Sequence, residues 1–212
     1  MTQPQGAVTI RASTISLHSM NQTKTVVGFY DKGAPYYQFS NFYPETFTDP
    51  LTGKVWSTSE HYFQAQKYCH PGSTPADLAY AELIRSANTP NKSFILARQK
   101  KKGGYASKWS MNPQNPMTLN AAIEQSIKDG VKMRPDWELI KEDVMRRALF
   151  LKFTQNPALQ KLLMSTGTAT IEEQSPRDWY WGTGKDGTGK NRLGALLQDL
   201  RKDLLDSGSK SC

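Results

Sequence analysis

The spacing of apolar residues along the chain predicts a series of helices separated by short extended segments. Apolar side chains recur every three to four positions in five segments, at about residues 76–87, 91–101, 136–154, 157–164 and 191–205. Another helix is expected to begin near Ser57, and a small one at about residues 119–128. Runs of β-branched and aromatic residues indicate strands or extended segments at 26–30, 39–42, 54–56 and 168–173. A length of 212 residues suits one domain, and the predicted helices and short strands together indicate the α+β class. The expected fold is therefore a mainly helical single domain with a few short strands.

Three parts of the chain depart from this pattern. Residues 1–24 are rich in Thr, Ser and Gln, which indicates a flexible N-terminal arm. The stretch at about 100–131 opens with the basic and glycine-rich segment 100–104 and is interpreted as an insertion in the domain. Residues 206–212 are expected to form a C-terminal tail. The folded domain is therefore expected at residues 25–205.

The segment from Trp56 to Lys67 carries the densest group of reactive side chains. Ser57, followed three residues later by Glu60, fits a capping box at a helix start. Glu60 and Lys67 would share one helix face about 10 Å apart, with the lysine leaning back toward the carboxylate. A sugar fits between such groups, and the free N–H groups of a helix start suit a phosphate. The sequence leaves open the alternative that Glu60 only caps and Lys67 is solvated; His61 is expected to pack.

A second segment, residues 178–191, contains four glycines within eight positions. Glycines permit close backbone approach to a ligand, and Asn191 is positioned to cap the following helix. Gly184 to Lys190 satisfies G-x-x-x-x-G-K, but Asn191 replaces the required Ser or Thr and no clear apolar strand precedes the segment. We therefore reject a nucleotide-hydrolase P-loop. A phosphate-binding loop at a helix N-terminus and an ordinary flexible loop remain as the two interpretations.

A third segment begins with Pro135, which suits the first turn of a helix. An apolar stripe follows it, formed by Trp137, Ile140, Val144 and Leu151. Trp137 is able to stack on a base, but its spacing alone favours a core position.

Charge and cysteine content restrict the function classes. Lys and Arg outnumber Asp and Glu by 27 to 19, giving a net charge of +8, which favours anionic partners such as nucleic acid or phosphorylated metabolites. The two cysteines, Cys69 and Cys212, argue against a disulfide framework, and three histidines without metal-ligand spacing argue against a metal site. No apolar run approaches the roughly 18 residues that span a bilayer, and no signal peptide is recognised. We expect a cytoplasmic or nuclear protein without a membrane partner.

These segments, taken in order, resemble the NADAR family of YbiA-like N-glycosidases. The resemblance covers about residues 25–100 and 132–205. Its most specific strings are S-E-H-Y-F-Q-A-Q-K at 59–67 and G-K-N-R-L-G at 189–194; F-S-N-F at 39–42 and W-E-x-x-K-x-x-V-M-R-x-A-L-x-x-K at 137–152 also match. The resemblance implies N-glycoside hydrolysis without a metal or other cofactor. Carried over by motif, the catalytic residues are Glu60, Lys67 and Asp178, and the substrate-binding residues are Asn41, Trp56, Arg98, Trp137, Trp181, Gly182, Lys190 and Asn191.

The resemblance implies that the bond between a phosphorylated ribose and a base is cleaved. Positive charge then develops at the anomeric carbon and negative charge on the base, so a carboxylate and a proton donor assist. Lys67, if unprotonated, is able to form a Schiff base with an opened ribose. The leading substrate is ADP-ribosylated guanine in nucleic acid or nucleotides, because the chain and its insertion are basic.

Two alternatives remain. The first is hydrolysis of phosphoribosylamino-pyrimidine intermediates of riboflavin biosynthesis. The second, of another class, is a non-catalytic ADP-ribose-binding module, against which the presence of Glu60, Lys67 and Asp178 together argues. The expected partners are an ADP-ribosylated or phosphoribosylated base and nucleic acid, and the protein is expected to be a monomer.

Overall fold

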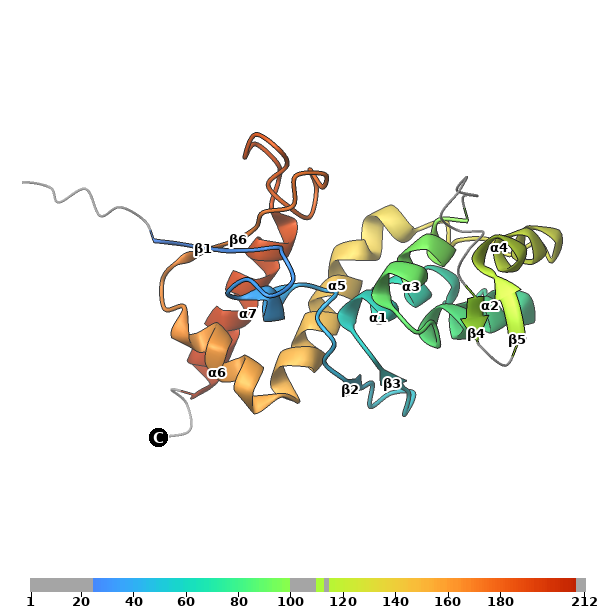
Figure 1. Cartoon of the computed structure of the whole chain (residues 1–212). Helices are drawn as coiled ribbons and strands as arrows, with labels where there is room; N and C mark the ends of the chain where they lie inside the picture. The colour runs from blue at the N-terminus through green and yellow to red at the C-terminus, as the bar shows by residue number, and fades with distance from the viewer. Residues whose placement is uncertain (1–24, 100–109, 113–114, 209–212) are drawn as a thin grey trace, which may run out of the picture.

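The structure, a computed structural model, describes residues 25–99, 110–112 and 115–208. Helices predominate in these residues and short strands complete a single domain, so the expected fold class is confirmed (Figure 1). The helices are α1 (Ser59–Ala65), α2 (Pro75–Arg85), α3 (Pro90–Ala97), α4 (Leu119–Lys128), α5 (Trp137–Thr154), α6 (Pro157–Ser165) and α7 (Arg192–Gly208). Two 3-10 turns are η1 (Tyr37–Phe39) and η2 (Gln66–Tyr68). The strands are β1 (Val26–Phe29), β2 (Phe47–Thr48), β3 (Val55–Trp56), β4 (Ser110–Asn112), β5 (Asn115–Thr118) and β6 (Thr170–Glu173).

The strands form three two-stranded sheets, of which the β1–β6 pair matters most for the site. β2 pairs with β3 and β4 with β5, both antiparallel, whereas β1 and β6 run parallel. Phe29 at the end of β1 is paired with Glu173 at the end of β6. The pairing therefore brings the first described strand beside the segment that leads into α7 (Figure 1).

Two apolar clusters form the core, and α5 contributes to both. Helices α1 to α4 bury most of their apolar side chains in the first cluster, to which α5 adds Ala148 and Leu151, whereas Phe63 of α1 lies in the second cluster. Strands β1 and β6 and helices α6 and α7 build the second cluster, to which α5 adds Leu149 and Phe153. A helix that is apolar on more than one face is buried between layers, which is where α5 lies in Figure 1. The molecule is thus two helical halves joined across α5.

The later part of the interpreted insertion belongs to the first half's core. Helix α4, predicted at 119–128, begins and ends at those residues. Its Leu119, Ala122 and Ile123 are at most 2% exposed and pack in the first cluster. The arm at 1–24 and the basic residues 100–102 lie outside the described residues. Helix α7 continues to Gly208, three residues beyond the expected domain boundary.

Several local predictions were wrong. Residues 39–42, expected to be extended, contain the end of η1 and a turn; Phe39 is fully buried against Phe29 and Phe153, so its aromatic ring serves the core rather than a strand. The N-cap of α1 is Thr58 rather than Ser57, and its hydroxyl accepts a hydrogen bond from the N–H of His61. The expected capping box is therefore absent, and the Glu60 carboxyl is not a cap.

No helix in the described ranges is both long enough and apolar enough to cross a membrane.

Candidate active site

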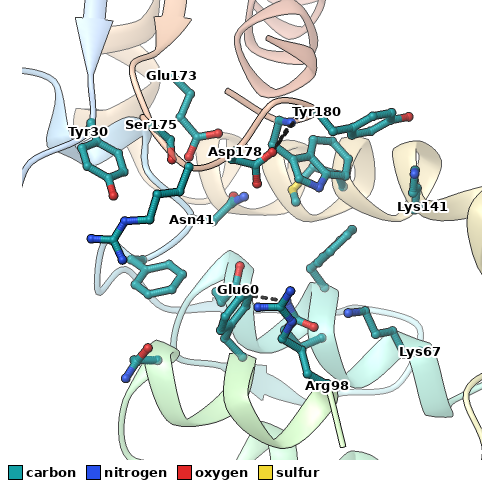
Figure 2. A pocket seen from close by; sticks show the side chains of 18 of the residues that line it. Tyr30, Asn41, Glu60, Lys67, Arg98, Lys141, Glu173, Ser175, Asp178 and Tyr180 are labelled. Carbon is teal, nitrogen blue, oxygen red and sulfur yellow. Dashed lines mark hydrogen bonds between the residues drawn. The ribbon is translucent and has the colours of Figure 1, made fainter. Parts of the chain in front are cut away.

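A cavity of about 880 Å³ lies between the two halves of the molecule. Helices α1 and α3 form one wall, and the connection between β6 and α7, residues 174–191, forms the opposite wall (Figure 2). We call this connection the β6–α7 segment. The first turns of α5 and the residues that follow β1 complete the lining. Seven predicted site residues line this cavity: Asn41, Glu60, Lys67, Arg98, Trp137, Asp178 and Trp181.

Glu60 is held on the α1 wall with little access to solvent. Its side chain is 5% exposed, and its Oε1 accepts a 2.7 Å hydrogen bond from Nε2 of Gln64. Burial raises the pKa of Glu60 to about 7, while the bond from Gln64 and the charge of Lys67 oppose the rise. Near neutral pH this carboxyl therefore exchanges between its ionised and protonated forms.

Lys67 lies in η2 rather than in α1, because α1 ends at Ala65. Its side chain still reaches the cavity, with Nζ 5.4 Å from the ring centroid of Trp137 and 5.7 Å from that of Phe63. Burial lowers the pKa of Lys67 to about 8, against the opposing charge of Glu60. A fraction of this amine is therefore uncharged near neutral pH, as an amine nucleophile requires.

Asp178 projects from the β6–α7 segment, and the backbone fixes its carboxylate. Its Oδ1 accepts hydrogen bonds of 2.9 Å from the N–H of Tyr180 and 2.7 Å from the N–H of Trp181. The Trp181 ring then packs edge-on against Phe63 of α1, with centroids 5.4 Å apart. This contact connects the two walls of the cavity beside the carboxylate.

Glu173 also lines the cavity, and the sequence did not predict it as a site residue. Burial raises the pKa of Glu173 to about 8, and the negative charges of Asp178 and Glu60 raise it further. Its Oε2 is buried without a hydrogen-bond partner in the described structure. Figure 2 shows Glu173 and Asp178 on the wall opposite Glu60. A glutamate at the end of a predicted strand, five residues before Asp178, was the available sequence signal.

Gly182 and Asn191 support the cavity without lining it. The Asn191 side chain bridges to β6, where Oδ1 accepts from the N–H of Glu173 at 3.0 Å and Nδ2 donates to the Ile171 carbonyl at 2.8 Å. A Cβ added at Gly182 would lie 2.8 Å from the Glu173 carbonyl oxygen and 3.0 Å from that of Asp178. Both residues therefore hold the acidic side of the cavity in place.

A phosphate-binding loop at the start of α7 was one of two interpretations of the sequence. The N–H groups of Asn191, Arg192 and Leu193 donate to the carbonyls of residues 182, 180 and 181, so they are not free for an anion. Lys190 is exposed outside the cavity lining, with Nζ 5.3 Å from the Tyr180 ring centroid.

Trp56 also lies away from the cavity. It is 4% exposed within the first apolar cluster and packs edge-on against Tyr62. The Trp56 side chain therefore belongs to the core. Four predicted substrate-binding residues lie outside the cavity lining: Trp56, Gly182, Lys190 and Asn191.

The turn that carries Asn41 is fixed from two directions. Ser59 at the start of α1 donates its hydroxyl to Oδ1 of Asn41, and the Asn41 carbonyl accepts from the N–H of Glu60. From α5, the fully buried Lys152 donates Nζ to the carbonyls of Gln38 and Ser40 at 2.7 and 2.9 Å. Burial lowers the pKa of Lys152 to about 7. This turn therefore sets the position of Glu60 relative to the rest of the cavity.

Three exposed cationic side chains lie among the residues that line the cavity. Arg98, Lys32 and Arg177 line it and are exposed, and none of them forms an ion pair within the described residues. The Arg98 guanidinium lies 4.8 Å from the ring centroid of Phe94. Lys141 differs because its Nζ pairs with Glu138 at 2.5 Å. The unpaired cations are available to bind phosphate groups.

Glu60, Asp178 and Glu173 do not form a metal site in the described part of the chain. Among the described residues, no set of three or more His, Cys, Asp or Glu side chains is arranged to hold a metal ion. Burial is the main cause of the raised pKa values of Glu60 and Glu173, and the negative charges of neighbouring carboxyl groups add to it.

The chain is similar to known N-glycosidases over most of its length. The NADAR domain family matches residues 28–205. N-glycosidase YbiA of Escherichia coli strain K12 is 36% identical over 195 residues, which cover 92% of this chain and 96% of the relative. N-glycosidase Npun_R5314 of Nostoc punctiforme is 31% identical, over 83% of this chain and 90% of the relative.

Two further similarities concern a riboflavin protein and a solved structure. Riboflavin biosynthesis protein PYRR of Zea mays is 32% identical over 85% of this chain but only 25% of its own length. The NMR structure of Escherichia coli YbiA superimposes with a TM-score of 0.63 at 34% identity, and the match covers 87% of this chain and 88% of that protein.

Proposed function

Because this chain belongs to the NADAR family and is an N-glycosidase, we propose that it removes ADP-ribose from ADP-ribosylated guanine in nucleic acid or nucleotides. The bond cleaved is the one between the anomeric carbon of a phosphorylated ribose and a nitrogen of the base. Its two cysteines fit a reducing compartment, and we assign the reaction to the cytoplasm or nucleus.

One observation carries the proposal: a buried carboxyl and a desolvated amine share a cavity with a backbone-fixed carboxylate. Glu60 and Lys67 come from one wall and Asp178 from the other. Burial moves the pKa of Glu60 up and the pKa of Lys67 down, so both titrate near neutral pH. Perturbed groups that converge in a cleft are typical of catalytic sites.

Each of these side chains has a role in breaking a ribose–base bond. Positive charge grows on the anomeric carbon as the base departs, and we assign Glu60 and Asp178 to its stabilisation. Lys67 in its uncharged form attacks C1 of the ring-opened riboside, and the bond from C1 to the base nitrogen breaks with its electron pair and a proton on the departing base. Water then hydrolyses the resulting Schiff base, which releases the sugar and restores the amine. Without the covalent step, the charged form of Lys67 contributes electrostatically.

The size and charge of the cavity favour a large anionic substrate. A volume of about 880 Å³ approaches the upper end of the roughly 300–1,000 Å³ that small-molecule sites occupy. Arg98, Lys32 and Arg177 provide separate positions for phosphate groups at its rim. A diphosphate linking two sugars uses more of this space and charge than one phosphoribosyl group. The net charge of +8 further favours nucleic acid.

A second candidate substrate is a phosphoribosylamino-pyrimidine intermediate of riboflavin biosynthesis. It is favoured by the names of two relatives, PYRR of Zea mays and riboflavin biosynthesis protein VVA0006 of Vibrio vulnificus. The chain spans only 25% and 38% of these two proteins, so the similarity concerns one part of each.

A substrate panel scored for released base tests the proposal. The panel contains ADP-ribosylated guanosine, an oligonucleotide with ADP-ribosylated guanine, and a phosphoribosylamino-pyrimidine. We expect guanine-containing product from the first two, and much slower release from the third. Faster release from the third would instead identify the riboflavin intermediate as the substrate. Binding of ADP-ribose without release from any substrate would instead identify a non-catalytic module and contradict the proposal.

A further inference from the structure

We propose that Glu173 is the proton donor to the departing base, an inference that rests on the proposed N-glycosidase reaction. Glu173 lines the cavity with Glu60 and Asp178, and Figure 2 shows it beside Asp178 on the wall facing Glu60.

The backbone of Glu173 is fixed on both sides, so the side chain starts from a defined position on the cavity wall. Its N–H donates to Oδ1 of Asn191, and its carbonyl accepts from both the N–H and the hydroxyl of Thr183, at 2.8 and 3.3 Å. The next residue, Gln174, donates its N–H to the carbonyl of Phe29 across the β1–β6 pair. Such restraints are what a proton donor needs in order to meet one atom of a substrate.

The surroundings of the Glu173 carboxyl favour its protonated form. Oε2 is buried and accepts no hydrogen bond, and no cation pairs with this side chain in the described structure. An ionised carboxylate with one oxygen in that position lacks compensation, whereas the protonated carboxyl, which lines the cavity, can donate its O–H to a bound base. The pKa of Glu173, raised to about 8 by burial and by Asp178 and Glu60, agrees with this arrangement. Glu173 therefore carries a proton at neutral pH.

The neighbouring groups suit other roles. Asp178 has one oxygen engaged by two backbone N–H groups, and Glu60 faces the charge of Lys67. The ionisable groups that line the cavity with Glu173 are Glu60 on α1, Lys67 on η2, Arg98 at the end of α3, Arg177, Asp178 and Tyr180 on the β6–α7 segment, Tyr30, Asp31 and Lys32 after β1, Tyr37 on η1, and Glu138 and Lys141 on α5. Glu173 is thus the protonated group that donates to the base, whereas Glu60 and Asp178 balance positive charge on the sugar. The roles of acid and of charge stabiliser therefore fall on different carboxyl groups.

The proposed step is balanced as follows. The bond between the anomeric carbon and the base nitrogen breaks, and its electron pair stays on that nitrogen. The proton of Glu173 moves to the leaving base at the same time, which leaves Glu173 ionised. Water adds its oxygen to the anomeric carbon and returns one proton to Glu173, so the carboxyl is restored without an oxidant or reductant.

The test compares two substrates that share a ribose 5-phosphate and differ in their leaving group. One carries a base that needs a proton to depart, and the other carries 4-nitrophenolate, which departs as a stable anion. Glu173→Gln is expected to lower turnover of the base substrate by about 10²- to 10⁴-fold, the usual contribution of a general acid, while turnover of the nitrophenyl substrate stays within a small factor of wild type. The alkaline decline of kcat/KM for the base substrate should also disappear.

Glu172→Gln is the matched control, because it is the preceding residue on β6 and lies outside the cavity lining. Successive strand residues point to opposite faces, so this variant makes the same carboxyl-to-amide change without touching the cavity, and both turnovers should be retained. Glu173→Asp, which keeps an acid on a shorter stem, should recover part of the loss if Glu173→Gln folds poorly. Folding of every variant is checked by thermal unfolding.

The outcomes separate this inference from the proposed function. Equal losses on both substrates, or an unchanged alkaline decline, would overturn the role of Glu173 while the N-glycosidase function stands. Wild-type protein that releases no base from any riboside would refute the function itself. Turnover of the base substrate by Glu173→Gln at the wild-type rate would overturn the inference alone.

Discussion

Glu60, Lys67 and Glu173 are ionisable side chains whose pKa values burial moves toward neutrality. Burial penalises charge, so the two carboxyl groups bind protons more tightly and the amine less tightly than in water. Enzymes that transfer protons near pH 7 use this displacement, because both protonation states are then populated. The chemistry of the cavity therefore follows from where these residues lie.

Borohydride trapping tests Lys67 directly. A Schiff base between Lys67 and an opened ribose is reducible, so borohydride added during turnover should attach the sugar to the protein at this residue. Lys67→Arg should abolish trapping and most turnover, because a guanidinium stays protonated. Lys190→Arg is the control and should trap like wild type, since Lys190 lies outside the cavity lining. Peptide mapping locates the adduct; an adduct at another lysine, or full turnover by Lys67→Arg, would contradict the covalent role.

The raised pKa values also predict a dependence of stability on pH. The pKa values of Glu60 and Glu173 rise from 4.5 to about 7 and about 8 on folding. The folded state then binds more protons than the unfolded state between those values, so these two groups stabilise the fold fully below about pH 4.5 and progressively less as the pH rises through 7 and 8.

Glu173→Gln should therefore gain stability relative to wild type as the pH rises from 5 to 8.5. Thermal unfolding of the two proteins across this range measures the difference, with Glu172→Gln as the control whose difference from wild type should stay flat. A difference for Glu173→Gln that is also independent of pH would show that the Glu173 carboxyl is not perturbed by folding.

The sequence predicted part of the cavity, and the missing part has a physical cause. Glu60 and Lys67 were recognisable because they lie seven residues apart. Glu173 was missed because its approach to them depends on the parallel β1–β6 pairing, which joins segments far apart in sequence. Asn191 was assigned to substrate, whereas its amide bridges strand backbone. The spacing of residues along the chain does not reveal which hydrogen-bond partner a loop side chain finds in the folded protein.

At the scale of elements, the β6–α7 segment acts as the support of the acidic wall. Its backbone closes on itself, with the N–H of Thr183 donating to Glu173 and the N–H of Gly189 donating to Thr183. Gly182 lies close against the backbone carbonyls of Glu173 and Asp178. Glycine is required there because any Cβ would meet backbone atoms.

Gly182→Ala should therefore displace the acidic wall. The added Cβ would lie 2.8 Å from the Glu173 carbonyl oxygen, so we expect a loss of about 1–3 kcal/mol in the free energy of unfolding together with a large loss of kcat. Gly187→Ala is the control in the same segment, since its Cβ would meet nothing within 4 Å although its φ of +79° is also strained for alanine. It should lose stability and keep turnover. Chemical unfolding and base release measure both effects; wild-type kcat in a folded Gly182→Ala protein would contradict the support role.

Helical periodicity predicted the long elements better than the short ones. The helices α2, α3, α5, α6 and α7 lie where apolar spacing indicated them, because each buries a continuous stripe. The turn at Tyr37–Phe39 was taken for extended structure, since its aromatic residues suit a strand as well as a core. The two-residue strand β2 was missed because so short a segment carries no period.

At the scale of the whole molecule, the reacting groups come from different halves. Glu60 and Lys67 belong to the half built around α1, and Glu173 and Asp178 to the half built around β6 and α7. Helix α5 packs into both clusters and fixes their distance. The cavity is therefore a property of the packed domain rather than of either half.

The positive charge of the chain predicts a salt dependence that differs between substrates. If Lys100, Lys101 and Lys102 bind nucleic acid, KM for an ADP-ribosylated oligonucleotide should rise steeply with salt concentration. KM for an ADP-ribosylated nucleoside should rise much less. Neutralising the three lysines should flatten the first dependence and leave the second unchanged. Steady-state kinetics at several salt concentrations decide the matter. Equal effects on both substrates would mean that this segment supports the fold or the cavity instead.

The most direct test of the central claim is single-turnover release of base by Glu60→Gln. Glu60 is proposed to stabilise the charge on the anomeric carbon, so this variant should lose most of the release rate. It should still fold, because the Glu60 carboxyl is not a helix cap. Glu82→Gln is the control because it removes the same charge on α2, outside the cavity lining, and it should release base at the wild-type rate. A folded Glu60→Gln protein that releases base as fast as this control would contradict the account.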